Sequence, residues 1–236
     1  MTTPLPVTRT PAARPAEGPP VVLVHGFASS ADVDWPAERW AEPLAAAGRE
    51  TIVVHLPGHP GGPRATPDDV TSRVLDGLAA AIGSGEIDLV GYSLGARLAW
   101  DLASRTTVRR LVLGGLSPQE PFAAVDLAAA RAAVQGGPSP ADPLTAAIAG
   151  LVSTGDAESL LSLVEGLAAE PFDPGASIPS VPTLFLAGQD DFMAHGIETL
   201  VARVAGARLK HVPGDHRGAL AGDEFRAAVF EFLGAA

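Results

Sequence analysis

The chain has 236 residues, which suits one large α/β domain, and its 47% hydrophobic residues are enough to bury a sizeable core. Its formal net charge of −11 repels phosphate backbones and argues against nucleic acid as a partner, while the absence of cysteine excludes disulfides, thiolate catalysis and cysteine-ligated zinc. The first residues lack a signal-peptide pattern and no run approaches the ~18 apolar residues of a membrane span, so we expect a cytoplasmic protein without membrane contact.

The first half of the chain alternates short apolar runs with helical patterns. Residues 1–19, rich in Pro, Thr and Ala, predict an N-terminal extension with at most one edge strand. Short apolar runs bounded by Pro and Gly predict buried strands, and apolar residues at helical spacing predict the helices between them. The expected strands are 5–10, 21–24, 51–54, 87–90 and 110–113, and the expected helices are 35–47, 66–82 with Thr66 as its cap, and 94–104.

The second half breaks this rhythm at residues 116–178, where Ala/Leu-rich helical patterns are interrupted by Gly and Pro. This stretch is too long for one crossover, so we expect a small helical lid over the carboxyl ends of the strands. Its composition suggests a largely apolar pocket. Strands at 183–186 and 207–212 and helices at 198–204 and 223–233 complete the chain. Alternating elements predict an α/β fold with a mostly parallel sheet, whose core comprises 20–115 and 179–236.

The strongest motif is Gly91-Tyr-Ser-Leu-Gly95, which matches G-x-S-x-G between a predicted buried strand and a predicted helix. A sharp strand-to-helix turn would hold Ser93 in a strained conformation and needs small residues on either side of it. The helix dipole and free N–H groups there favour developing negative charge. This context identifies Ser93 as the candidate nucleophile.

Three further motifs occur in the expected chain order: His25-Gly-Phe27, Gly188-Gln-Asp-Asp191 and Pro213-Gly-Asp-His-Arg-Gly218. With these motifs and the Ser93 turn, residues 20–235 resemble the α/β-hydrolase superfamily. The resemblance implies an α/β-hydrolase fold, a small-molecule substrate, no cofactor and no metal. It also implies the order serine, acid, histidine along the chain. His216, in the loop between the last strand and the last helix, occupies the position of the general base. His195 comes too early and His211 lies within a strand.

The resemblance also selects the remaining site residues. The family pattern G-x-x-D after the fifth strand favours Asp191 as the triad acid, with Asp190 as the open alternative. The His25-Gly26-Phe27 loop implies an oxyanion hole formed by the backbone N–H groups of Phe27 and Leu94. The residues expected near the substrate are His25, which we interpret mainly as a structural anchor of the loop, Gly26, Tyr92 and Arg97.

These residues predict hydrolysis of a carboxylic ester, lactone or thioester through an acyl-enzyme on Ser93. Two alternatives stay open. The elbow, with Tyr92 before the serine and Arg97 after it, also resembles that of the menaquinone-pathway synthase, a lyase, although Arg97 reads more simply as a helix-surface residue. The chain could instead be a non-catalytic ligand-binding member of the fold. His55 and His59 make a poor metal site without a clustered carboxylate, and we interpret them as loop histidines that either shape the pocket or are solvated. The sequence carries no signal for the oligomeric state.

Overall fold

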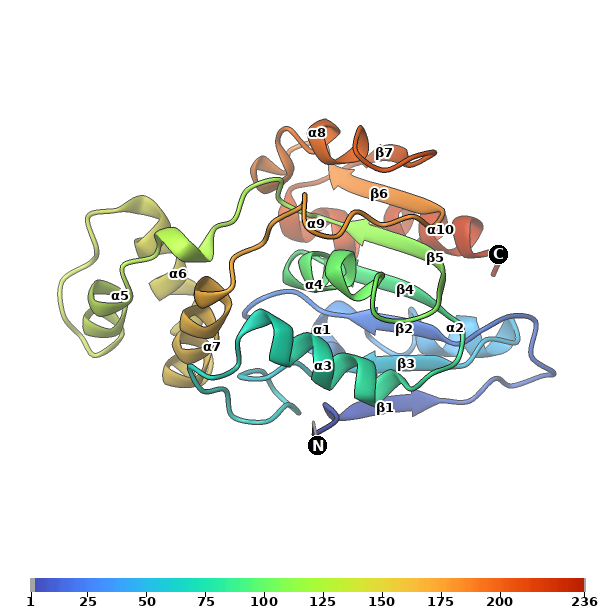
Figure 1. The fold of residues 1–236 in the computed structure, drawn as a ribbon, viewed down its shortest axis with the longest axis horizontal. Coiled ribbons are helices and arrows are strands. Elements are labelled where there is room, and N and C mark those ends of the chain that lie inside the picture. The colour runs from blue at the N-terminus through green and yellow to red at the C-terminus, as the bar shows by residue number, and fades with distance from the viewer. Residues whose placement is uncertain (1–2, 236) are drawn as a thin grey trace.

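The computed structural model describes residues 3–235, and its centre is a seven-stranded sheet in the order β1-β3-β2-β4-β5-β6-β7 (Figure 1). Five successive strand pairs are parallel, and only the edge strand β1 runs antiparallel to its neighbour β3. This arrangement confirms the predicted mostly parallel α/β sheet. The strands are β1 (Val7–Thr10), β2 (Val21–Val24), β3 (Thr51–Val54), β4 (Ile87–Tyr92), β5 (Val108–Gly114), β6 (Thr183–Gly188) and β7 (Arg208–Val212).

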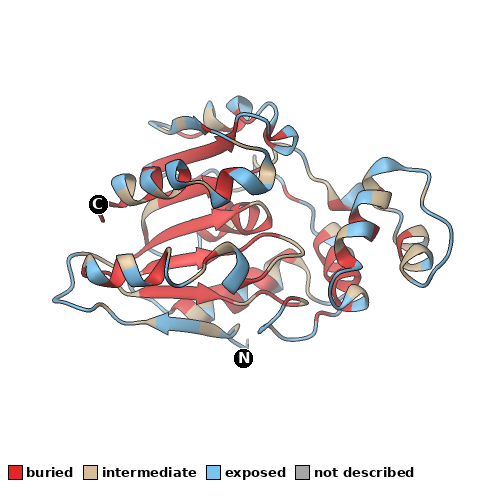
Figure 2. Cartoon of the chain, turned by 180° about the vertical axis from the view of Figure 1, so that it is seen from behind, coloured by how far each residue is buried: buried red, intermediate tan, exposed pale blue. Residues whose placement is uncertain are grey.

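Helices cover both faces of the sheet, which explains why most residues of its central strands are buried and apolar. In β2, Val22 and Val24 pack into one hydrophobic cluster, while Val21 and Leu23 pack into another on the opposite face. Figure 2 shows the buried strands between the two helical layers. The first cluster includes residues of α3 (Thr71–Ile82), α4 (Leu94–Leu102) and α8 (Glu198–Val201); the second includes residues of α1 (Ala31–Asp34), α2 (Ala41–Ala46), α9 (His216–Ala221) and α10 (Asp223–Leu233).

Two predicted helices differ from the structure near their starts. The helix expected at 35–47 forms only in its second half, because α1 ends at Asp34 and α2 begins only at Ala41. Proline at 36 disfavours a helical conformation of the residue before it, which separates the two. The Thr66 cap is wrong. Asp69 accepts the Thr66 N–H at 2.8 Å and closes a turn there, so α3 starts at Thr71.

The segment 116–178 contains three helices that extend beyond the carboxyl ends of the parallel strands (Figure 1). They are α5 (Leu127–Val134), α6 (Pro143–Val152) and α7 (Ala157–Ala169), preceded by the short 3₁₀ helix η1 (Phe122–Ala124). Aspartates cap all three helices by accepting a backbone N–H, as expected for helix N-termini. Within residues 3–235, no helix is both long enough and apolar enough to cross a bilayer.

A buried ion pair joins the amino end of β4 to the segment just before β3, and its loss should destabilise the fold strongly. Asp88 is fully buried, pairs with the buried Arg49, and accepts Arg109 Nε–H at 2.9 Å. Asp88→Ala would leave the Arg49 guanidinium buried without its counter-charge, so we expect the free energy of unfolding to fall by about 3–5 kcal/mol. Urea denaturation measures this loss.

The matched control removes an exposed carboxylate directly before β3. Glu50 pairs with Arg9 at 2.9 Å, and both side chains are exposed. Glu50→Ala should cost no more than about 1 kcal/mol, because solvent screens exposed ion pairs. Equal losses in the Asp88 and Glu50 variants would contradict the structural role of the buried pair.

Candidate active site

Ser93 lies in the turn that joins β4 to α4, in a conformation that non-glycine residues rarely adopt. Its φ is 52° and its ψ is −114°, and such strain persists only where the surrounding structure imposes it. Glycine is required on both sides. A Cβ on Gly91 would collide with the carbonyl oxygen of Gly95, and a Cβ on Gly95 with that of Val24. The motif therefore forms the strained strand-to-helix turn that the sequence predicted.

The side chains of Ser93, His216 and Asp191 form one continuous hydrogen-bonded chain. Ser93 Oγ lies 2.9 Å from His216 Nε2, and His216 Nδ1 lies 2.8 Å from Asp191 Oδ2. Asp191 is buried, and its other oxygen accepts the Met193 N–H at 3.0 Å. Asp190, the alternative acid, is exposed and makes no hydrogen bond to His216 among the described residues.

The same hydrogen bonds fix the imidazole tautomer. A buried carboxylate facing Nδ1 requires the proton there, which leaves Nε2 free to accept the Ser93 hydroxyl proton. The Tyr92 hydroxyl donates to the His216 backbone carbonyl, and the two rings lie 5.4 Å apart. Burial raises the pKa of Tyr92, so its hydroxyl keeps the proton that it donates. Tyr92 thus holds the backbone of His216 in place. It also lines the cavity beside Ser93, where it was expected near the substrate.

The sequence missed the short helix α9, which begins at His216. Asp215 caps this helix by accepting the Arg217 and Gly218 N–H groups at 3.1 and 2.8 Å. Six residues containing a glycine give no helical period, so the sequence predicted a loop. Because His216 is the first residue of this helix, the cap fixes the backbone position from which its imidazole extends.

Two backbone N–H groups beside Ser93 have no hydrogen-bond partner among residues 3–235. One belongs to Leu94, the first residue of α4, where no intrahelical acceptor exists. The other belongs to Phe27, although the N–H groups of both its neighbours are bound: Gly26 to Asp34 at 2.7 Å, and Ala28 to His59 at 3.0 Å. These are the two donors that the sequence analysis assigned to an oxyanion hole.

His25 is fully buried and lies behind this loop, outside the cavity. Its Nδ1–H donates to the Gly26 carbonyl at 2.9 Å and its Nε2 accepts the Leu56 N–H at 3.2 Å. Burial lowers the pKa of His25 to about 4. The neutral ring therefore anchors the loop, as the structural interpretation of this residue expects, and does not line the space open to a substrate.

Arg97 is buried, so its interpretation as a helix-surface residue is wrong. Its guanidinium lies 3.2 Å from the carboxylate of Glu120 and donates to the carbonyls of Leu167 and Glu170 at 3.2 and 3.1 Å. Glu120 in turn accepts the Phe172 N–H at 2.7 Å. Arg97 thus joins α4 to both ends of the 116–178 segment, and it does not line the cavity beside Ser93.

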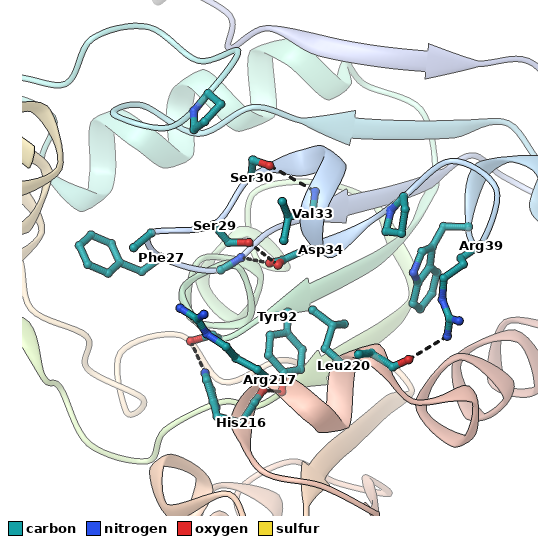
Figure 3. A pocket seen from close by; sticks show the side chains of 17 residues that line it. Phe27, Ser29, Ser30, Val33, Asp34, Arg39, Tyr92, His216, Arg217 and Leu220 are labelled. Atoms are coloured by element: carbon teal, nitrogen blue, oxygen red, sulfur yellow. Dashed lines mark hydrogen bonds between the residues drawn. The ribbon is translucent and has the colours of Figure 1, made fainter. Parts of the chain in front are cut away.

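A cavity of about 580 Å³ opens beside Ser93 and His216 (Figure 3). Its wall is mostly apolar, with Val33, Trp40 and Leu220 among its residues, and Asp34, Arg39 and Arg217 supply the charges. Within the described chain, none of its lining residues comes from 116–178. The expectation that the lid's composition sets the pocket is therefore wrong for this cavity, whose residues come mainly from the loop of residues 26–30, from α1 and the segment that follows it, and from α9.

The loop histidines do not form a metal site in the structure. His55 is hydrogen-bonded to Thr8 at 2.9 Å, whereas His59 is buried and faces the Phe27 loop. Among residues 3–235, no three His, Asp or Glu side chains gather as metal ligands. His59 and Asp34 were not assigned to the site from sequence, and both contact it through the backbone of residues 26–28.

Comparison with known proteins identifies the family to which this fold belongs. A family model described as the alpha/beta hydrolase fold matches residues 19–137, half of the chain. This protein belongs to the α/β-hydrolase family. A hydrolase from Pseudomonas aeruginosa shares this α/β-hydrolase fold with a TM-score of 0.74 at 22% identity, covering 98% of this chain and 94% of that one. MenH from S. aureus does so with a TM-score of 0.70 at 19% identity, covering 97% of each chain.

Sequence similarity to curated relatives covers a shorter stretch of this α/β-hydrolase. A Pseudomonas putida 2-hydroxy-6-oxononadienedioate/2-hydroxy-6-oxononatrienedioate hydrolase is 33% identical over 110 residues, which are 43% of this chain and 38% of that protein. A hydrolase of the same description from Dechloromonas aromatica is 32% identical over 101 residues, which are 40% and 35% of the two chains. The matches thus span little more than a third of the length of these relatives.

Proposed function

We propose that this protein is a serine hydrolase that cleaves a carboxylic ester, lactone or thioester of a small molecule through an acyl-enzyme on Ser93. The observation that carries this proposal is the unbroken chain of hydrogen bonds from Ser93 through His216 to the buried Asp191, which starts at a strained elbow. A serine hydroxyl becomes an effective nucleophile only when a positioned base takes its proton. The curated relatives are named as hydrolases, which supports hydrolysis as the general reaction.

In the first half-reaction, Ser93 Oγ attacks the carbonyl carbon while its proton passes to His216 Nε2. Asp191 stabilises the imidazolium, and the oxyanion accepts hydrogen bonds from the N–H groups of Phe27 and Leu94. The bond to the leaving group then breaks, and the leaving group takes the proton from His216. This half-reaction leaves the acyl group on Ser93.

Water completes the cycle as the second nucleophile, and Ser93 becomes the leaving group. It attacks the acyl carbonyl carbon as His216 Nε2 takes one of its protons, and the oxyanion returns to the same two N–H groups. When the bond from the carbonyl carbon to Ser93 Oγ breaks, the serine regains that proton and the carboxylic acid leaves. No external oxidant, reductant or metal enters this balance.

The buried position of Arg97 counts against the synthase-type lyase alternative. That alternative needs Arg97 to face the substrate, whereas its guanidinium is paired with Glu120 in the interior. The names of the curated relatives indicate a further substrate to test, a hydroxy-oxo-dienedioate. Arg217 is exposed and lines the cavity, which would suit a carboxylate of such a substrate.

The decisive experiment is covalent labelling of Ser93. A fluorophosphonate probe should label the protein on the peptide that contains Ser93, and 4-nitrophenyl acetate should give a burst followed by an acetyl adduct on the same peptide in mass spectrometry. Ser93→Ala should abolish both signals. A folded protein that shows neither burst nor label would overturn the proposal and favour the ligand-binding alternative, whereas labelling at another residue would overturn the assignment of Ser93.

A further inference from the structure

Three consecutive peptide units in the loop of residues 25–28 are each held by one side chain. Asp34 Oδ2 accepts the Gly26 N–H at 2.7 Å, His25 Nδ1–H donates to the Gly26 carbonyl at 2.9 Å, and His59 Nε2 accepts the Ala28 N–H at 3.0 Å. Figure 3 shows Asp34 with its hydrogen bonds in the wall of the cavity. The middle unit contains the Phe27 N–H, the one backbone donor in this run without a partner among the described residues.

Because a peptide unit is planar and trans, these contacts also fix the direction in which the Phe27 N–H points. In such a unit the C=O and N–H bonds point in opposite directions. Because the Gly26 carbonyl faces the buried ring of His25, the Phe27 N–H must point away from that ring, which is the side of the cavity and Ser93. The bonds on the two flanking units prevent the middle unit from turning about its neighbours.

The loop would not keep this shape without such support. Ala28 has a φ of 53°, and it and Ser93 are the two non-glycine residues with positive φ among those described. A left-handed alanine is strained, and strained backbone persists only where its surroundings impose it. His59 Nε2 accepts the N–H of this strained residue and so helps to hold it in place.

We propose that Asp34 and His59 are positioning residues that aim the Phe27 N–H at the oxyanion of the reaction, each by holding a peptide unit next to it. This inference rests on the proposed serine hydrolase function and extends it to two residues that do not belong to the triad. Neither side chain donates to the oxyanion itself. Each acts as a hydrogen-bond acceptor for the backbone, so acceptor capacity is the property that matters at both positions.

The chemistry of both side chains fits an acceptor. His59 Nδ1 lies 2.8 Å from the Pro57 carbonyl and must carry the proton, which leaves Nε2 with its lone pair towards Ala28. Asp34 also accepts from the Ser29 hydroxyl, so both of its oxygens are engaged. Its negative charge next to a developing oxyanion is unfavourable, and an amide oxygen at the same place could hold the Gly26 N–H without that charge.

The test compares variants that keep the acceptor with variants that remove it. Asp34→Asn and His59→Gln retain an oxygen that can reach the bound N–H, whereas Asp34→Ala and His59→Phe do not, and phenylalanine also preserves a ring. We expect the acceptor-free variants to lower kcat for 4-nitrophenyl acetate by about 10- to 100-fold, below the loss from deleting an oxyanion donor outright. Asp34→Asn and His59→Gln should stay within about 3-fold of the parent protein.

A second readout separates positioning from general damage to the fold. A trifluoromethyl ketone forms a tetrahedral adduct that uses the oxyanion hole, so its inhibition constant should rise in parallel with the loss of kcat, while KM changes little. Asp142→Ala is the matched control. It removes another aspartate that accepts a backbone N–H, from Thr145 at 2.7 Å at the start of α6, and it should leave kcat and the inhibition constant unchanged.

The outcomes distinguish this inference from the proposed function. If activity is independent of Ser93, the proposed function itself fails. If Ser93-dependent activity persists and folded Asp34→Ala and His59→Phe retain the parent kcat, only the positioning role is overturned. Equal losses in the acceptor-keeping and acceptor-free variants would also overturn it, because they would indicate a purely structural role for both side chains.

Discussion

Replacing His216 by alanine should lower kcat for a 4-nitrophenyl ester by about 10⁴- to 10⁶-fold while leaving KM almost unchanged. The imidazole is the group that contacts the Ser93 hydroxyl, at 2.9 Å, and without it no described side chain remains hydrogen-bonded to that hydroxyl. Residual hydrolysis would reflect binding and the oxyanion donors alone. Steady-state kinetics, with active-site titration to correct for inactive protein, measure the loss.

The chain offers matched controls for this result. His195 is exposed just beyond Asp191, and His195→Ala should retain kcat within a few-fold. At the acid, Asp191→Asn should cost about 10⁴-fold, because an amide cannot hold the proton on His216 Nδ1. Asp190→Asn, one residue away and exposed, should cost little. A large loss at Asp190 together with a small one at Asp191 would reverse the assignment of the acid.

The free energy of unfolding should fall by about 4 kcal/mol between pH 8 and pH 5 because of His25 and His59 alone. Burial lowers the pKa of His25 to about 4 and that of His59 to about 3, from 6.5 in an unfolded chain. The folded protein therefore keeps both rings neutral while the unfolded chain protonates them. Unfolding takes up protons in this range, so acid favours the unfolded state, at up to about 1.4 kcal/mol per pH unit for each ring.

Urea denaturation at several pH values tests this dependence, with His59→Gln as the comparison. That variant removes one titrating ring while keeping a hydrogen-bond acceptor, so its stability should fall about half as steeply with acid. Burial raises the pKa of Asp34 and Asp101, and this acts in the opposite direction, because a carboxyl that protonates more readily when folded gains stability as the pH falls. A pH dependence that is identical in the variant would contradict the role assigned to His59.

Elements with a strong local signal were predictable from sequence. The apolar runs at 21–24 and 51–54 form β2 and β3 with the expected bounds, and the amphipathic pattern at 223–233 forms α10. When helices cover both faces of a sheet, its strands are nearly continuous apolar runs, which makes them easy to recognise. The helix expected at 35–47 failed in its first half because prolines and tertiary packing of the tryptophans outweighed a weak helical period.

The candidate site was predictable where it depends on chain order and local turns. Ser93, Asp191 and His216 each follow a parallel strand, and the carboxyl ends of such strands meet at one edge of the sheet. The contacts of Asp34 and His59 with the loop at 26–28 had no such signal. They join residues 8 and 31 positions apart through backbone N–H groups, so no side-chain pattern in the sequence marks them.

The junction at Arg97 has a consequence for how such proteins diversify. Strands β5 and β6 are neighbours in the sheet, and the whole 116–178 excursion leaves and returns between them. Because Glu120 near its start and Leu167 and Glu170 near its end meet at one guanidinium, the excursion is closed at its base. Within the excursion, α7 is also tied to the core, because Ser159 accepts the Ala65 N–H at 2.8 Å and Leu161 shares the hydrophobic cluster of β2. We therefore expect the turn between α5 and α6 to accept insertions best, with no change in the register of the strands or in the alignment of Ser93 with His216.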